Sequence, residues 1–116
     1  MLTSSFRYNP AVVAQAFATL GCLAPGRVIL DVRTGEPMNE VSVGVTWPDR
    51  SECLARLKDA ITLIQQLFRE EFVTFEDDFY RTHNATICDR PSSRCRFRSP
   101  RPDRRQHAWP AASAMA

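Results

Sequence analysis

The chain has no run of about 18 consecutive apolar residues, so no segment is predicted to cross a membrane as a helix. Its first residues also lack the charged and apolar regions of a signal peptide. The four cysteines include no C-x-x-C pair, which argues against a zinc site of that kind. Together these absences predict a cytoplasmic protein without a membrane partner or a metal site.

The cysteines divide into two pairs by position. Cys22 and Cys53 fall within predicted helices, where a thiol packs as a small apolar group, so both are expected in the core. Cys88 and Cys95 are separated by six residues and could form a metal-binding or disulfide pair. Because no further ligands accompany them, we expect no metal there.

Charge is distributed unevenly along the chain. From Arg90 onward there are seven arginines and one aspartate, a net charge of +6, whereas residues 1–89 carry eight basic and twelve acidic groups, a net charge of −4. The C-terminal part also contains four prolines and no amphipathic pattern. This division predicts a folded segment over 1–89 and a disordered Arg/Pro-rich tail over 90–116.

The first predicted helix leads directly into the first predicted strand. An Asn-Pro pair at 9–10 is typical of a helix start, and Gly21 of a helix end. Five apolar residues recur at helical spacing and are expected to face the core: Val12, Val13, Ala16, Phe17 and Leu20. The β-branched run over 28–32 predicts a strand buried on both faces. A helix followed by such a strand predicts an α/β fold with a parallel sheet.

A second helix is predicted from a capping box at Asp49 and Glu52 to about residue 70. Its apolar stripe is expected to pack in the core: Leu54, Leu57, Ile61, Ile64 and Phe68. The apolar segments 72–75 and 79–81 flank three consecutive acidic residues, which indicates a hairpin with a solvated turn.

The candidate functional residues follow the strand over 28–32. Thr34, Gly35, Glu36 and Asn39 supply a hydroxyl, a glycine, a carboxylate and an amide at its carboxyl end, where α/β enzymes place ligands. Glycine lets the backbone approach a flat ring closely, Thr34 and Asn39 can hydrogen-bond its edge, and Glu36 is the acid-base candidate. An ordinary polar turn is the alternative that this spacing leaves open.

A series of short blocks carries a resemblance to a known family. The blocks are Phe6-Arg7-Tyr8-Asn9-Pro10-Ala11-Val12, Gln15-Ala16-Phe17-Ala18-Thr19, Gly21-Cys22-Leu23, Arg27-Val28, Thr34-Gly35-Glu36, Asn39-Glu40, Trp47-Pro48 and Ala55-Arg56-Leu57. In order and spacing they resemble the luciferase-like flavin- and deazaflavin-dependent oxidoreductases. Over residues 2–89 the nearest subgroup is the F420-dependent glucose-6-phosphate dehydrogenases. This resemblance implies part of a (β/α)8 TIM barrel.

The resemblance also implies a cofactor, a substrate and roles for five residues. The cofactor is coenzyme F420, with FMN as the alternative of a luciferase-like monooxygenase, and the substrate is a small sugar phosphate that gives up a hydride. Glu36 matches the active-site glutamate that protonates the deazaflavin ring. Thr34, Gly35 and Asn39 match cofactor contacts, and Thr3 matches a cofactor-contacting threonine.

The chain also departs from the pattern of the family. Asp31 and Arg33 stand where relatives commonly have glycines, and are expected to cost stability or to block the site. Positions equivalent to the family's histidine base and substrate-phosphate lysines are not found in the sequence. These departures predict an enzyme fragment that is inactive alone, and leave open a homodimer or a complementing second chain.

The tail beyond Arg90 admits two interpretations. One permitted choice of codons, read in a shifted frame, yields a sequence that resembles the family's next strand, its cofactor loop and the following helix, which suggests a frameshift product. The alternative is a basic tail that binds nucleic acid through its arginines together with Phe97 and Trp109.

Overall fold

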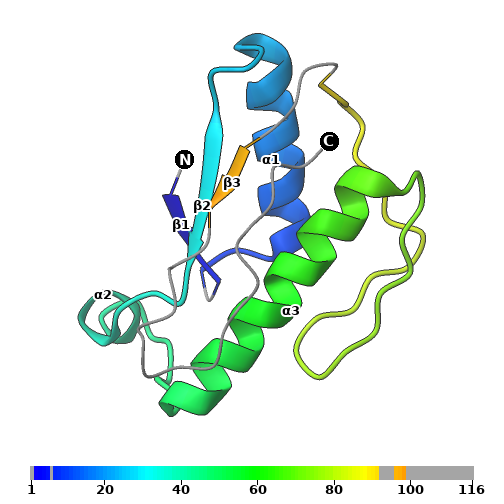
Figure 1. Cartoon of the computed structure of the whole chain (residues 1–116). Coiled ribbons are helices and arrows are strands. Elements are labelled where there is room, and N and C mark those ends of the chain that lie inside the picture. Colours follow the sequence, from blue (N-terminus) through cyan, green and yellow to red (C-terminus); the bar gives the residue numbers. More distant parts are fainter. Residues whose placement is uncertain (1, 6, 92–95, 99–116) are drawn as a thin grey trace.

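The computed structural model describes residues 2–5, 7–91 and 96–98, which form one parallel sheet with two long helices against it (Figure 1). The strands are β1 (Leu2–Ser4), β2 (Ile29–Arg33) and β3 (Arg96–Arg98). The helices are α1 (Pro10–Leu23), α2 (Pro37–Val41) and α3 (Arg50–Arg69). Because α1 lies between β1 and β2 in the sequence, and α3 between β2 and β3, the predicted α/β fold with a parallel sheet is confirmed.

The central strand β2 pairs in parallel with both neighbours. Thr3 of β1 pairs with Val32, and Leu30 pairs with Phe97 of β3. The β1–β2 pairing extends beyond the strands, because the Ser5 backbone N–H donates to the Arg33 carbonyl oxygen at 2.9 Å. Parallel strands end at the same edge of a sheet, so the residues that follow β1 and β2 are brought together there.

Helix α1 begins as predicted, because the Asn9 side chain accepts a hydrogen bond from the Ala11 backbone N–H at 2.9 Å. Its buried residues are Pro10, Val13, Ala14, Phe17, Ala18 and Gly21. The predicted face is wrong in part, since Val12 is 59% and Leu20 40% exposed and Ala16 and Cys22 are also exposed. Most residues of this helix are apolar or small, so their spacing did not identify the arc that faces the core.

Both ends of α3 are capped by side chains. The Asp49 carboxylate accepts a hydrogen bond from the Glu52 backbone N–H at 2.9 Å, as the capping box predicted. At the other end the Arg90 guanidinium donates to backbone carbonyls, a favourable position for a cation. Its acceptors are Leu67 at 3.2 Å, Phe68 at 3.4 Å, Glu70 at 2.7 Å and Glu71 at 3.4 Å. The predicted bounds of the second helix are therefore confirmed to within a residue.

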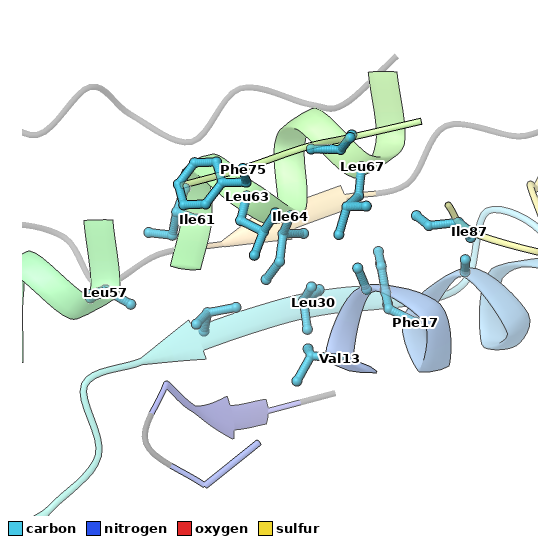
Figure 2. Close-up of a cluster of buried hydrophobic side chains, with 14 residues drawn as sticks. Val13, Phe17, Leu30, Leu57, Ile61, Leu63, Ile64, Leu67, Phe75 and Ile87 are labelled. Atoms are coloured by element: carbon cyan, nitrogen blue, oxygen red, sulfur yellow. The ribbon is translucent and has the colours of Figure 1, made fainter. Parts of the chain in front are cut away.

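The hydrophobic core lies between one face of β2 and the two long helices (Figure 2). Leu30 and Val32 are 0% and 1% exposed, and Leu63 of α3 is fully buried. Of the predicted α3 stripe, Leu57, Ile61 and Ile64 are buried, Phe68 is half-buried and Leu54 is exposed. Cys53 is buried, as expected.

The other face of β2 differs from the prediction of a strand buried on both faces. Ile29 and Asp31 are half-buried and Arg33 is exposed. The reason is that α1 and α3 both pack on the side of Leu30 and Val32, so the core covers one face of the sheet.

The segment after α3 forms the predicted hairpin, held by two isolated antiparallel bridges, Val73 with Ala85 and Glu76 with Arg81. The Tyr80 hydroxyl donates a hydrogen bond of 2.6 Å to the Ser5 carbonyl oxygen. This bond ties the hairpin to the end of β1.

The predicted tail is described only at residues 90–91 and 96–98. Because Arg96–Arg98 form β3, the expectation of disorder does not apply to these three residues, whose backbones pair with β2. Cys95, Trp109 and the rest of the tail lie outside the described residues. No helix in the described part of the chain is long and apolar enough to span a bilayer.

Three carboxylates meet where α3 faces the hairpin. Asp59 is 9% exposed, and its pKa is raised by burial, by the nearby charges of Asp77 and Asp78, and by a hydrogen bond to Asp77. A carboxyl whose pKa is raised in the folded state binds its proton more tightly there, so it lowers stability at a pH above its folded pKa.

We expect Asp59→Asn to raise the free energy of unfolding at pH 7, because it removes this partly buried charge. The gain should shrink as the pH falls below the folded-state pKa of Asp59, where its carboxyl is protonated in the unaltered chain too. Thermal unfolding followed by circular dichroism between pH 3.5 and 7.5 measures it, and a gain that does not vary with pH would contradict this account.

We expect Leu63→Ala to lower the free energy of unfolding by about 2–5 kcal/mol, because it opens a cavity in the core. Leu54→Ala on the same helix is the matched control: Leu54 is 38% exposed, so its loss should stay below about 1 kcal/mol. Urea unfolding compares the two variants, and similar losses would mean that the described core is wrong.

Candidate functional site

A cavity of about 530 Å³ lies at the carboxyl ends of β1 and β2. Its lining residues come from β1 and the segment between β1 and α1, from the end of β2, and from the turn and the helix α2 that follow it: Thr3, Ser4, Arg7, Tyr8, Arg33, Thr34, Gly35, Glu36, Asn39 and Glu40. All five residues that the sequence singled out are among them. The parallel pairing of β1 with β2 explains why Thr3 joins residues more than 30 positions further along the chain.

The turn after β2 packs closely against its surroundings. Gly35 has φ +89°, a conformation that L side chains rarely adopt. A Cβ at this position would lie 2.5 Å from the Ser4 Oγ and 3.2 Å from the Glu40 Oε1. Glycine is therefore required both by the backbone and by the space available.

Glu36 occupies the N-cap position of α2, but its side chain makes no capping hydrogen bond. Its backbone carbonyl accepts hydrogen bonds from the N–H groups of Asn39 and Glu40, each at 3.1 Å. The carboxylate is exposed at the cavity, so it is accessible to a bound molecule.

Thr34, Asn39 and Thr3 contribute neutral polar side chains to the cavity. The Thr34 hydroxyl makes a long contact of 3.4 Å to the Gly35 carbonyl oxygen. The Asn39 side chain is exposed, and Thr3 is half-buried in the middle of β1. These hydroxyl and amide groups can donate and accept hydrogen bonds at the edge of a planar ligand.

Asp31 and Arg33 form an ion pair along β2. The Arg33 Nη2 and Nε lie 3.0 Å and 3.2 Å from the Asp31 carboxylate oxygens. The hydrogen bond and the charge of Asp31 raise the pKa of the Arg33 guanidinium. The pairing gives each charge a partner. Arg33 lines the cavity, which has its volume of about 530 Å³ with the Arg33 side chain in place.

Five lining residues did not appear among the predicted site residues: Ser4, Arg7, Tyr8, Arg33 and Glu40. Glu40 is the most unexpected, because its side chain is 2% exposed and its Oε1 lies 3.5 Å from the Arg7 Nη2. A glutamate in a short polar segment gives no local sign of burial. The contact with Arg7, 33 positions earlier, is a product of tertiary structure.

The remaining titratable clusters do not add to this cavity. In the described part of the chain, no group of three or more histidine, cysteine, aspartate or glutamate side chains could hold a metal ion. His83 is exposed in the hairpin segment and is not among the lining residues.

Comparison with known proteins gives a consistent family assignment. The sequence matches the luciferase-like monooxygenase family over residues 1–112. It is 62% identical over 91 residues to an F420-dependent glucose-6-phosphate dehydrogenase of Kineococcus radiotolerans, and 60% identical over 95 residues to the protein of that name from Intrasporangium calvum. The matches cover 78% and 79% of this chain and 27% and 28% of the two relatives. This chain belongs to the luciferase-like monooxygenase family.

A solved structure extends the comparison to the fold. It is an F420-dependent secondary alcohol dehydrogenase in complex with an F420-acetone adduct, 35% identical in sequence, with a TM-score of 0.80. The match covers 84% of this chain and 30% of that chain. Since that enzyme is a TIM barrel, the predicted partial (β/α)8 barrel is confirmed.

We expect Gly35→Ala to destabilise the chain more than Gly44→Ala does. Both glycines have nearly the same backbone angle, φ +89° and +88°, so both substitutions incur the strain of an alanine at positive φ, of the order of 1–2 kcal/mol. A Cβ at Gly44 has nothing within 4 Å, whereas at Gly35 it would press on Ser4 and Glu40. Urea unfolding measures the loss of unfolding free energy in each variant, and the difference between the two losses is the packing contribution at Gly35. Equal losses would show that there is no such contribution.

Proposed function

We propose that this chain binds coenzyme F420 in the cavity beside Gly35, as part of an oxidoreductase that transfers a hydride from a sugar phosphate to the deazaflavin. The observation that carries the proposal is the convergence of Thr34, Gly35, Glu36 and Asn39 on one cavity. The chain that contains them is 50–62% identical to several F420-dependent glucose-6-phosphate dehydrogenases.

The cavity suits a planar, polar-edged ring. Its volume of about 530 Å³ is within the usual range of small-molecule sites, about 300–1,000 Å³. The turn at Gly35 has no side chain to keep a ring at a distance, and Thr34 and Asn39 carry groups that can hydrogen-bond a ring edge. Thr3 adds a hydroxyl from the neighbouring strand.

Each residue has a distinct role in this proposal. F420 supplies the ring that accepts the hydride. Thr3, Thr34 and Asn39 hold the cofactor by hydrogen bonds, and Gly35 allows its close approach. The Glu36 carboxyl, exposed and not used as a helix cap, holds the proton that the reduced ring takes up.

The same geometry limits what the 116-residue chain does alone. Oxidation of a sugar hydroxyl requires a base for the hydroxyl proton in addition to the group that serves the ring. Of the two lining carboxylates, Glu36 is exposed, whereas Glu40 is buried and paired with Arg7. Among the residues that the structure describes, ten line the cavity, and none of these is a histidine or a lysine. We therefore propose cofactor binding without turnover.

FMN is the less favoured cofactor. The relatives with the highest identities named above are F420-dependent by name, and so is the structural neighbour. A parallel titration with FMN tests this preference directly.

We expect the purified chain to bind F420 saturably, and Thr34→Val to weaken binding about five- to tenfold through loss of a hydrogen bond. Thr86→Val is the matched control, since Thr86 is exposed and does not line the cavity. The fluorescence of F420 reports its binding, and its absorbance reports reduction in the presence of glucose 6-phosphate. Failure to bind F420, tighter binding of FMN, or equal effects of the two variants would contradict the site proposal, and measurable reduction would contradict the proposed inactivity.

A further inference from the structure

We infer that Arg7, positioned by the buried carboxylate of Glu40, is a further binding residue of the cavity and contacts an electron-rich oxygen of the cofactor. This inference rests on the proposed binding of F420. It assigns a role to an ion pair that lies beside the turn at Gly35 and lines the same cavity as Glu36.

The first argument concerns the burial of Glu40. Its side chain is 2% exposed, and a buried carboxylate is costly unless other groups satisfy it. Its Oε1 contacts Arg7, but its Oε2 is buried with no hydrogen-bond partner in the part of the chain that the structure describes. A carboxylate kept buried with one oxygen unsatisfied requires an explanation other than stability.

The position of Glu40 supplies that explanation. Its Oε1 and Cγ would lie 3.2 Å and 3.3 Å from a Cβ on Gly35, so the side chain supports the turn that presents Glu36 to the cavity. The same Oε1 is the atom that contacts Arg7. Glu40 therefore fixes the position of the turn and of the guanidinium together.

The second argument concerns the unused donors of Arg7. A guanidinium carries five N–H donors, and the contact with Glu40 engages Nη2 at 3.5 Å, long for a charge-assisted hydrogen bond. The Arg7 side chain is 46% exposed at the cavity. The Arg7 backbone N–H donates to the Ser4 carbonyl oxygen at 3.3 Å, which anchors the residue at the end of β1.

The other arginine of the cavity is engaged differently. Arg33 directs both Nε and Nη2 to Asp31, two residues away on the same strand. Arg7 is thus the lining cation with more donors left for a ligand. Such a group matches the carbonyl oxygens of the deazaflavin ring or the phosphate oxygens of the cofactor's side chain.

We expect Arg7→Met to weaken F420 binding about tenfold or more, as loss of a charge-assisted hydrogen bond implies, and Arg7→Lys to restore part of the affinity. Arg27→Met is the matched control, because Arg27 is exposed and does not line the cavity. Repeating the titrations with the deazaflavin chromophore that lacks the phosphate-bearing side chain distinguishes the two oxygen sources. A loss with both ligands identifies a ring oxygen, and a loss with F420 alone identifies the phosphate.

Glu40→Gln separates positioning from stability. Neutralising a buried carboxylate removes its desolvation cost, and the Arg7 side chain that remains is 46% exposed and stays hydrated, so the melting temperature should not fall. F420 affinity should fall severalfold because Arg7 loses the charge that holds it. Unchanged affinity in Arg7→Met, or in Glu40→Gln, while the unaltered chain binds F420, would overturn this inference and leave the proposed function intact. No binding by the unaltered chain would overturn both.

Discussion

The rest of the structure depends on the burial of one face of β2. Leu30 and Val32 are almost fully inaccessible because α1 and α3 pack over them. Figure 2 shows Leu30 of β2 among the core side chains of the two helices. Covering that face with two helices that follow parallel strands places β2 in the middle of the sheet. The carboxyl ends of β1 and β2 then lie at one edge, and the cavity forms there. The position of the site is thus a consequence of how the core is built.

The uncovered face and the end of β2 have a different character. Asp31 and Arg33 pair on the strand itself, and the chain then turns at Gly35 against Ser4 and Glu40. Close packing in this turn couples the site to the fold, because any larger residue at Gly35 displaces side chains from both β1 and α2. The features proposed to bind a cofactor are therefore also features on which local stability depends.

Local sequence signals predicted the two long helices and β2 well and their environment less well, and they did not predict the short helix α2. The caps at Asn9 and Asp49 fixed the helix starts because they involve hydrogen bonds between neighbours in the sequence. The buried face of α1 was predicted wrongly in part, because apolar residues occur on most sides of this helix. The β3 strand had no signal in an arginine-rich tail, since its pairing with β2 is formed by backbone groups of residues more than 60 positions apart.

The sequence by itself determined the starts of the two long helices, the α/β class, the family and the polar turn at Thr34, Gly35 and Glu36. Each of these is encoded within a few neighbouring residues or in the order of short blocks. Only the tertiary structure decided which face of α1 is buried, how the pairing of β1 with β2 brings Thr3 to the turn, and that Glu40 is enclosed beside Arg7. The physical reason is that burial and ion pairing depend on segments 30 or more positions apart, whose approach is set by packing over β2.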